Sequence, residues 1–398
     1  MNFRLALGAI ALAVLAACGG GNPASPAAPT TSDTTRVIAF GDSLTDGGAY
    51  SRGNSLILQL NVGVPKPAAD LVGKFTNSPG DIWVEVLAKR LNLTIAPERF
   101  EVGAASQVAG TNGTNSAANA NNYAQGGSRV TDLVRRNGVL VREPGVGCSP
   151  NAAGACTAQA AVPVKTQIDR ALAKGNFSAT DLVLVWAGAN DVFFNATVAG
   201  EEITATATAL RRPLTDLETQ AIVGKYVIAM EEAALETLVQ VKRLQAAGAQ
   251  KVVLMTIPNA AQTPFGVSGG PSSQGLFTAL SGAYNNQLKK EIQLQDPGVL
   301  LFDAGALSSA WYTNPSSVGF VNVQAPVCNV PAALGSSSSF CFIVGPTPSP
   351  SNPFLRPLPA GVTQANSMFA DGVHPSVASH ALFGGAVYDA LKARAWVK

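Results

Sequence analysis

The sequence is poor in charged residues. Asp, Glu, Lys and Arg make up 13% of its 398 residues, compared with about 25% in an average soluble protein. The formal net charge is only +2, and the chain contains no basic cluster. Because nucleic acids bind strongly basic surfaces, we expect no nucleic-acid partner. Hydrophobic residues form 47% of the chain, which is ample for a large buried core.

The sequence also lacks an apolar run near its start that is long enough to span a bilayer, which takes about 20 residues. The run at residues 5–17 is shorter, follows Arg4 and precedes Cys18. Such a pattern is typical of an export signal. Leu15-Ala16-Ala17-Cys18 resembles the bacterial lipobox, in which the cysteine is acylated and becomes the mature N-terminus. We expect residues 1–17 to be a lipoprotein signal peptide and Cys18 the lipid attachment site; the alternative is a plain secretory signal.

The chain that follows the cysteine indicates where the protein is exported. Residue 19 is glycine rather than aspartate, which by resemblance to sorted lipoproteins favours the outer membrane over simple secretion. Residues 18–35 are rich in Gly, Pro, Ala, Ser and Thr without apolar periodicity, so we expect a flexible tether. Residues 36–398 contain no repeat or second linker and are expected to form one domain. Its oligomeric state, and the side of the membrane it faces, are left open.

Cysteine is scarce as well. Apart from Cys18, the chain contains four cysteines, which are Cys148, Cys156, Cys328 and Cys341. An even number in an exported protein indicates disulfides, with three possible pairings. The members of the pairs 148/156 and 328/341 lie close together in loop-like sequence, so two local bridges are the simplest prediction. Metal binding is the alternative, but no histidine lies near these cysteines in the sequence, and we expect no metal site.

Continuous apolar runs of strand length alternate with helical patterns. The predicted strands are residues 37–40, 181–186, 251–257 and 299–302, and the main helices are residues 81–91, 164–174, 216–247, 274–295 and 376–393. This alternation predicts an α/β fold with three layers, α/β/α, around a mostly parallel central sheet. The ligand crevice of such a sheet lies beyond the carboxyl ends of its strands. Residues 196–213, 258–273 and 311–359 are expected to be irregular and to wall or cover the crevice.

Ser43 stands where the first predicted strand ends, in Gly41-Asp42-Ser43. A serine there can be a helix N-cap, or a nucleophile if the chain supplies a base, an orienting acid and oxyanion donors. The only two histidines are His374 and His380. His380 falls inside the last predicted helix, where we expect a packed or solvent-facing side chain. His374 follows Asp371 by three residues on a turn, so the carboxylate can reach one imidazole nitrogen and leave the other for a serine.

Four motifs occur in a fixed order along the chain. They are FGDSLTD at residues 40–46, NYAQGGS at 122–128, GAND at 188–191 and DGVHP at 371–375. Together they resemble the GDSL, or SGNH, hydrolase family over essentially all of residues 36–393. Residues 73–83, 257–266 and 314–328 look like its bacterial outer-membrane esterase and phospholipase branch. The resemblance implies a flavodoxin-like SGNH hydrolase fold that hydrolyses acyl esters without a metal or cofactor.

The resemblance implies a role for each matched residue. Ser43 matches the nucleophile, and Asp371 and His374 match its acid and base. Asn190 matches a side-chain oxyanion donor, and the N–H of Ser43 itself matches a backbone donor. The chemistry agrees, because a tetrahedral oxyanion requires preorganised neutral N–H groups.

A further backbone donor is implied within the second motif. It falls on Gly126 or Gly127, and the spacing from Asn122 favours Gly127. Asp42 and Asp191 also stand in the motifs, and we interpret them as structural turn residues.

A second serine motif competes with Ser43. Residues 266–270 fit G-x-S-x-G, the nucleophile turn of α/β-hydrolases, which requires a strand directly before it and a helix directly after it. The nearest predicted strand ends at Ile257, and Pro264 and Pro271 flank the motif. We therefore expect a flexible glycine loop and prefer Ser43 to Ser268.

The sequence thus predicts a serine carboxylester hydrolase, an esterase or lipase that acts through an acyl-enzyme. The same site would also serve an acyltransferase or a phospholipase, and a non-catalytic surface lipoprotein with a decayed hydrolase fold is the alternative from another class. The substrate is undefined beyond an acyl ester. Phe193, Phe194, Phe265, Trp311, Tyr312 and Phe320 either line an acyl groove or pack the long connections.

Overall fold

The computed structural model describes residues 34–98, 120–130, 133–136, 139–142, 145, 161–292, 298–343 and 354–398. The predicted signal peptide with Cys18, and the predicted bridge between Cys148 and Cys156, lie outside the described residues. Within the described ranges, no helix combines the length and the apolar character that crossing a membrane requires.

Four parallel strands form the central sheet, in the order β1-β4-β5-β6. They are β1 (Arg36–Gly41), β4 (Asp181–Trp186), β5 (Lys251–Met255) and β6 (Val299–Phe302). All residues of β4 and β5 are buried, as are those of β1 after Arg36. Such burial is typical of a sheet covered on both faces, and it explains the continuous apolar runs. A separate antiparallel pair consists of β2 (Leu133–Arg136) and β3 (Val139–Arg142).

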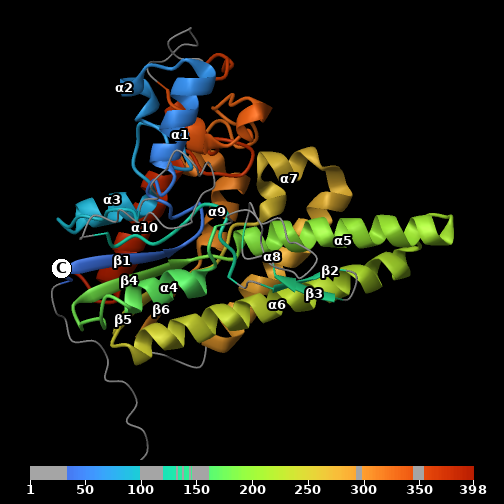
Figure 1. Ribbon diagram of the computed structural model, residues 1–398, viewed down its shortest axis with the longest axis horizontal. Coiled ribbons are helices and arrows are strands. Elements are labelled where there is room, and N and C mark those ends of the chain that lie inside the picture. The colour runs from blue at the N-terminus through green and yellow to red at the C-terminus, as the bar shows by residue number, and fades with distance from the viewer. Residues whose placement is uncertain are drawn as a thin grey trace, which may run out of the picture.

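Helices cover both faces of the sheet, which confirms the predicted three-layer α/β/α fold. On one face α3 (Trp83–Arg90) packs against α10 (Val377–Ala393). On the other face lie α4 (Val164–Leu172) and α6 (Asp216–Ala246), and α8 (Gly270–Ile292) packs against α6 (Figure 1). The further α-helices are α1 (Ser51–Ile57), α2 (Lys66–Ala69), α5 (Ala189–Leu210), α7 (Pro264–Ser268) and α9 (Ala304–Thr313).

The prediction that residues 196–213 are irregular is wrong. Most of them belong to α5, which runs beside α6 beyond the edge of the sheet (Figure 1). The segment is rich in alanine and threonine, so it has no apolar periodicity that would indicate a helix. In the structure each of four threonine hydroxyls donates to the carbonyl four residues earlier, a bond that helices accommodate. These residues are Thr197, Thr204, Thr206 and Thr208.

Two other segments are also more regular than predicted. Residues 258–273 contain α7 and the start of α8, so Ser268 ends a short helix and does not lie in a flexible glycine loop. Residues 311–343 contain the end of α9 and three short 3₁₀ turns. The proline and glycine residues that indicated loops mark the starts and ends of these short elements.

A second, smaller apolar cluster lies beside the main core. It joins Leu58, at the C-terminal end of α1, to Val327, Phe342 and Phe354. The disulfide Cys328–Cys341 lies within this cluster, which confirms one of the two predicted bridges.

The carboxyl ends of the strands meet at one edge of the sheet, as a parallel sheet requires. Residues 120–130 run along the free side of β1, where Tyr123 N–H donates to the Ala39 carbonyl at 2.8 Å and Gln125 N–H donates to the Gly41 carbonyl at 3.2 Å. This pairing brings the second sequence motif beside the first.

Candidate active site

Ser43 lies on the turn that follows β1. Gly41 ends the strand with a φ of 149°, and a Cβ atom there would come within 2.0 Å of the Trp186 carbonyl oxygen, so only glycine fits. Asp42 Oδ1 accepts the Leu44 N–H at 3.0 Å and shapes the turn. Burial raises the pKa of Asp42 to about 7.

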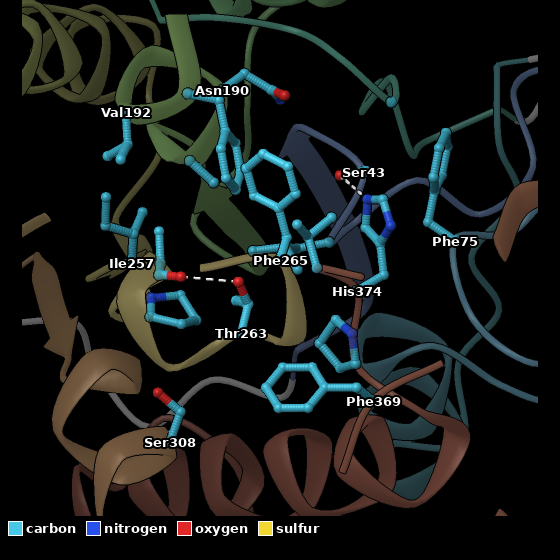
Figure 2. A pocket seen from close by; sticks show the side chains of 18 of the residues that line it. Ser43, Phe75, Asn190, Val192, Ile257, Thr263, Phe265, Ser308, Phe369 and His374 are labelled. Atoms are coloured by element: carbon cyan, nitrogen blue, oxygen red, sulfur yellow. Dashed lines mark hydrogen bonds between the residues drawn. The ribbon is translucent and has the colours of Figure 1, made fainter. Parts of the chain in front are cut away.

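Ser43, His374 and Asp371 form one continuous series of hydrogen bonds. His374 Nε2 lies 2.8 Å from Ser43 Oγ (Figure 2), and its Nδ1 lies 2.7 Å from Asp371 Oδ2. His374 comes from the turn before α10, which begins after the N-cap Ser376. The structure therefore brings Ser43 together with His374, which lies 331 positions away in the sequence, and with its neighbour Asp371.

The Asp371 carboxylate is buried and anchored by backbone N–H groups. Oδ1 accepts from Val373 at 2.9 Å and from His374 at 2.8 Å, and Oδ2 accepts from Ser338 at 2.6 Å. Burial alone would raise the pKa of Asp371, but the His374 ring and the N–H donors of Val373 and His374 outweigh burial and hold it well below its ordinary value. An ionised carboxylate at this position accepts the Nδ1 proton and leaves Nε2 to accept from the Ser43 hydroxyl.

The second histidine and the second serine motif lie elsewhere. His380 is fully buried in α10, where its Nδ1 accepts the Trp83 N–H at 3.3 Å. Burial lowers the pKa of His380 to about 3, as expected for a packed neutral side chain. Ser268 Oγ donates to the Phe265 carbonyl at 2.8 Å at the end of α7.

Ser43, Gly127 and Asn190 line one cavity, and each carries an N–H group suited to an oxyanion. Among the described residues, the backbone N–H groups of Ser43 and Gly127 donate to no backbone carbonyl. Gly127 adopts a φ of 84°. The N–H of Gly126, in contrast, donates to Asp46 Oδ2 at 2.8 Å, which favours Gly127 as the donor to a ligand.

Asn190 lies in the first turn of α5, directly after β4. Its Nδ2 donates one hydrogen to the Ser128 carbonyl at 2.9 Å, which fixes the amide beside the second motif. The other amide hydrogen remains for a ligand in the cavity, where Asn190 lies above Ser43 in Figure 2.

Two buried side chains that the sequence analysis did not identify hold these turns in place. Gln167, from α4, bonds both backbone groups of Gly41 and lies 3.0 Å from Ser128 Oγ. Arg129 forms an ion pair with Asp191 at 3.0 Å, with 2% and 0% of the two side chains exposed. Gln167 stands in an ordinary amphipathic helix, so nothing in its sequence context indicates this contact.

Asp46 is a third such residue, although it stands in the first motif. Its Oδ1 accepts the N–H groups of Gly48 at 2.8 Å and Ala49 at 2.6 Å, while Oδ2 holds Gly126. Burial raises the pKa of Asp46 to about 6. Asp46 therefore links the Ser43 turn to the glycine turn.

The cavity beside Ser43 has a volume of about 740 Å³ and is mostly apolar. Its walls come from the start of α5, from residues 257–265, from residues 368–375, and from α9 and α10. No Asp, Glu, Lys or Arg occurs among the described residues that line it. In the part of the chain that the structure describes, three or more His, Cys, Asp or Glu side chains never gather as a metal site would require.

Comparison with known proteins identifies the family. No curated protein matches the chain. The model of the GDSL-like lipase/acylhydrolase family matches residues 37–387, which run from β1 into α10 and include Ser43, Asn190 and His374. The chain therefore belongs to the GDSL-like lipase/acylhydrolase family and is a hydrolase that acts on ester bonds.

Proposed function

We propose that the protein is a serine carboxylester hydrolase, an esterase or lipase, with Ser43 as its nucleophile. The observation that carries this proposal is the hydrogen-bonded series from Ser43 Oγ through His374 to Asp371, with distances of 2.8 and 2.7 Å. A serine hydroxyl is a weak nucleophile until an adjacent, oriented base takes its proton.

In the first step the Ser43 oxygen attacks the ester carbonyl carbon while His374 Nε2 accepts its proton. Asp371 stabilises the imidazolium that forms. The carbonyl oxygen becomes an oxyanion that accepts hydrogen bonds from the Ser43 N–H and from Gly127 and Asn190. When the intermediate collapses, the ester C–O bond breaks, His374 gives its proton to the alcohol oxygen, and the acyl group remains on Ser43.

In the second step water releases the acyl group. The water oxygen attacks the carbonyl carbon of the acyl group while His374 takes a proton from the water. The oxyanion donors of the first step stabilise the second oxyanion as well. The bond from the carbonyl to Ser43 Oγ then breaks, and His374 returns the proton to Ser43. The products are a carboxylic acid and an alcohol, and the enzyme is restored.

Paired serine variants test the nucleophile. We expect Ser43→Ala to lower kcat/KM for a p-nitrophenyl ester by about 10³-fold or more, and to abolish labelling by a fluorophosphonate probe. Ser268→Ala, the matched control in the competing motif, should retain activity within about twofold because its hydroxyl bonds only locally. Activity that survives in Ser43→Ala but is lost in Ser268→Ala would refute the assignment.

We also propose that the protein is exported and attached to the outer membrane by a lipid on Cys18, with residues 18–35 as tether and residues 36–398 as the hydrolase domain. The apolar run at residues 5–17 and Leu15-Ala16-Ala17-Cys18 support this proposal. Mass spectrometry of the membrane fraction should find an acylated N-terminal Cys18, and Cys18→Ser should move the enzyme to the soluble fraction. An unmodified Cys18 inside a longer mature chain would contradict it.

A further inference from the structure

The reaction geometry distinguishes two sides of the cavity, and this inference rests on the proposed function. His374 must protonate the leaving alcohol, so the alcohol part of the ester lies toward His374 and the acyl part points away from it. The ring of Phe75 lies 4.9 Å from the His374 ring, on the alcohol side. Val192 and Ile257 lie on the opposite side of the cavity, with Phe265 between them and Ser43 (Figure 2).

We propose that this opposite side is a binding site for an uncharged aliphatic acyl chain longer than acetyl, and that Phe265 of α7 determines how strongly the chain is held. The site, called the acyl chamber below, comprises the lining residues that lie away from His374 in Figure 2, which are Val192, Ile257, Thr263, Phe265 and Ser308.

The two hydroxyl groups of the acyl chamber already donate hydrogen bonds within the protein. Thr263 Oγ1 donates to the Ala260 carbonyl at 2.7 Å, and Ser308 Oγ donates to the Gly305 carbonyl at 3.1 Å. A hydroxyl has one proton to donate, so neither can donate to a substrate as well. A charged acyl chain would lose its hydration here without gaining a partner of opposite charge, because no Asp, Glu, Lys or Arg occurs among the described residues that line the cavity, whereas an aliphatic chain gains from burial.

The size of the cavity indicates a chain longer than acetyl. Its volume of about 740 Å³ falls within the range of roughly 300–1,000 Å³ that is typical of sites enclosing whole small molecules. Each methylene that enters an apolar site can raise kcat/KM by up to about fourfold, because burying it is favourable. We therefore expect activity to rise with acyl length until the chamber is filled.

Phe265 lies in a cluster of three aromatic rings at the chamber. Its ring centroid lies 6.0 Å from that of Phe193 and 5.9 Å from that of Phe277. Phe277 is buried, but 52% of Phe265 is exposed. A half-exposed phenyl ring that lines an apolar cavity has further surface to bury, and an acyl chain would cover it.

The backbone links Phe265 to the reacting groups. Its N–H donates to the Gly372 carbonyl at 2.8 Å, and Gly372 lies in the turn that carries Asp371 and His374. The position of α7 is therefore coupled to the position of His374.

Steady-state kinetics on p-nitrophenyl esters from acetate to dodecanoate test the chamber. In the wild type, kcat/KM should rise from acetate to octanoate. Phe265→Ala should lower the octanoate-to-acetate ratio of kcat/KM by about tenfold, and Phe265→Leu should restore part of this ratio. Val321→Ala is the matched control, because Val321 is 61% exposed and lies outside the cavity lining; it should change nothing.

A second comparison tests the requirement for an uncharged chain. The p-nitrophenyl hexanoate should be hydrolysed on the order of a hundredfold faster than the ester whose six-carbon acyl chain ends in a carboxylate. Equal rates would overturn the inference, as would a Phe265→Ala variant that slows acetate and octanoate by the same factor. If Ser43→Ala still hydrolyses every ester, the proposed function fails instead, so the two failures are distinguishable.

Discussion

Gln167 binds both backbone polar groups of Gly41, donating to its carbonyl at 2.8 Å and accepting its N–H at 2.9 Å. The side chain thereby makes the pair of backbone hydrogen bonds that a neighbouring strand would otherwise make, at the residue where β1 ends and the Ser43 turn begins. The same amide nitrogen lies 3.0 Å from Ser128 Oγ, next to Gly127. One buried side chain from α4 thus connects the turn of the proposed nucleophile to the turn of a proposed oxyanion donor.

Gln167→Leu should destabilise the protein and slow the reaction. It leaves the Gly41 N–H buried without its Gln167 partner, at a cost of about 1–3 kcal/mol, while the Gly41 carbonyl keeps the hydrogen bond from the Gln125 N–H. A small displacement of Ser43 should lower kcat by about tenfold or more. Urea unfolding and ester kinetics measure the two effects. Gln287→Leu in α8 is the control, because within the described ranges that amide bonds only to Glu291 on the same helix. A Gln167→Leu variant with wild-type stability and kcat would contradict the role given to Gln167.

Asn190→Ala should lower kcat by about 10²–10³-fold, which is the usual cost of losing one oxyanion donor. KM should change little, because the proposed hydrogen bond strengthens only in the transition state. The control is Asn286→Ala, which removes an exposed asparagine from α8. A variant with raised KM and unchanged kcat would indicate that Asn190 binds the substrate without stabilising the oxyanion.

Replacing Cys328 and Cys341 together with serine should lower the free energy of unfolding by about 3 kcal/mol, the value expected for a closed loop of about 15 residues. These two cysteines are 13 positions apart, and the loop between them carries Ser338, whose N–H donates to Asp371. Loosening the loop should therefore also lower kcat, by a few-fold. Calorimetry and kinetics on the double variant check both effects. A double variant that loses stability but keeps the wild-type kcat would show that the loop does not position Asp371.

The buried Asp42 should make stability fall as the pH rises from 4 to 7. Burial raises its pKa to about 7 in the folded protein, whereas the unfolded value is about 3.9. Between these values the unfolded state binds fewer protons, so this carboxyl lowers the free energy of unfolding as the pH increases. Asp42→Asn cannot ionise, and its stability relative to the wild type should increase by a few kcal/mol over this range. Urea unfolding at pH 4, 5.5 and 7 measures the trend; a constant difference would contradict it.

The sequence predicted the strands better than the helices of the active-site wall. The strands at residues 181–186 and 299–302 agree residue for residue with the structure, because strands buried on both faces are continuous apolar runs. The helix α5 was not predicted, because its alanine and threonine residues have no apolar stripe. Its stability comes from packing against α6 and α8, and such contacts have no local signature.

The three-layer fold, and the residues able to meet at the sheet edge, could be predicted from the amino-acid sequence alone. This was possible because apolar runs, strand-ending turns and rare residue types, such as the histidine at 374, are properties of short segments. Which of these groups are in contact depends on tertiary packing, because Gln167 and Gly41 are 126 positions apart and Ser338 and Asp371 are 33 positions apart. The same holds for the apolar chamber under Phe265. Contacts between distant segments depend on how the elements pack, and that packing is a property of the whole chain.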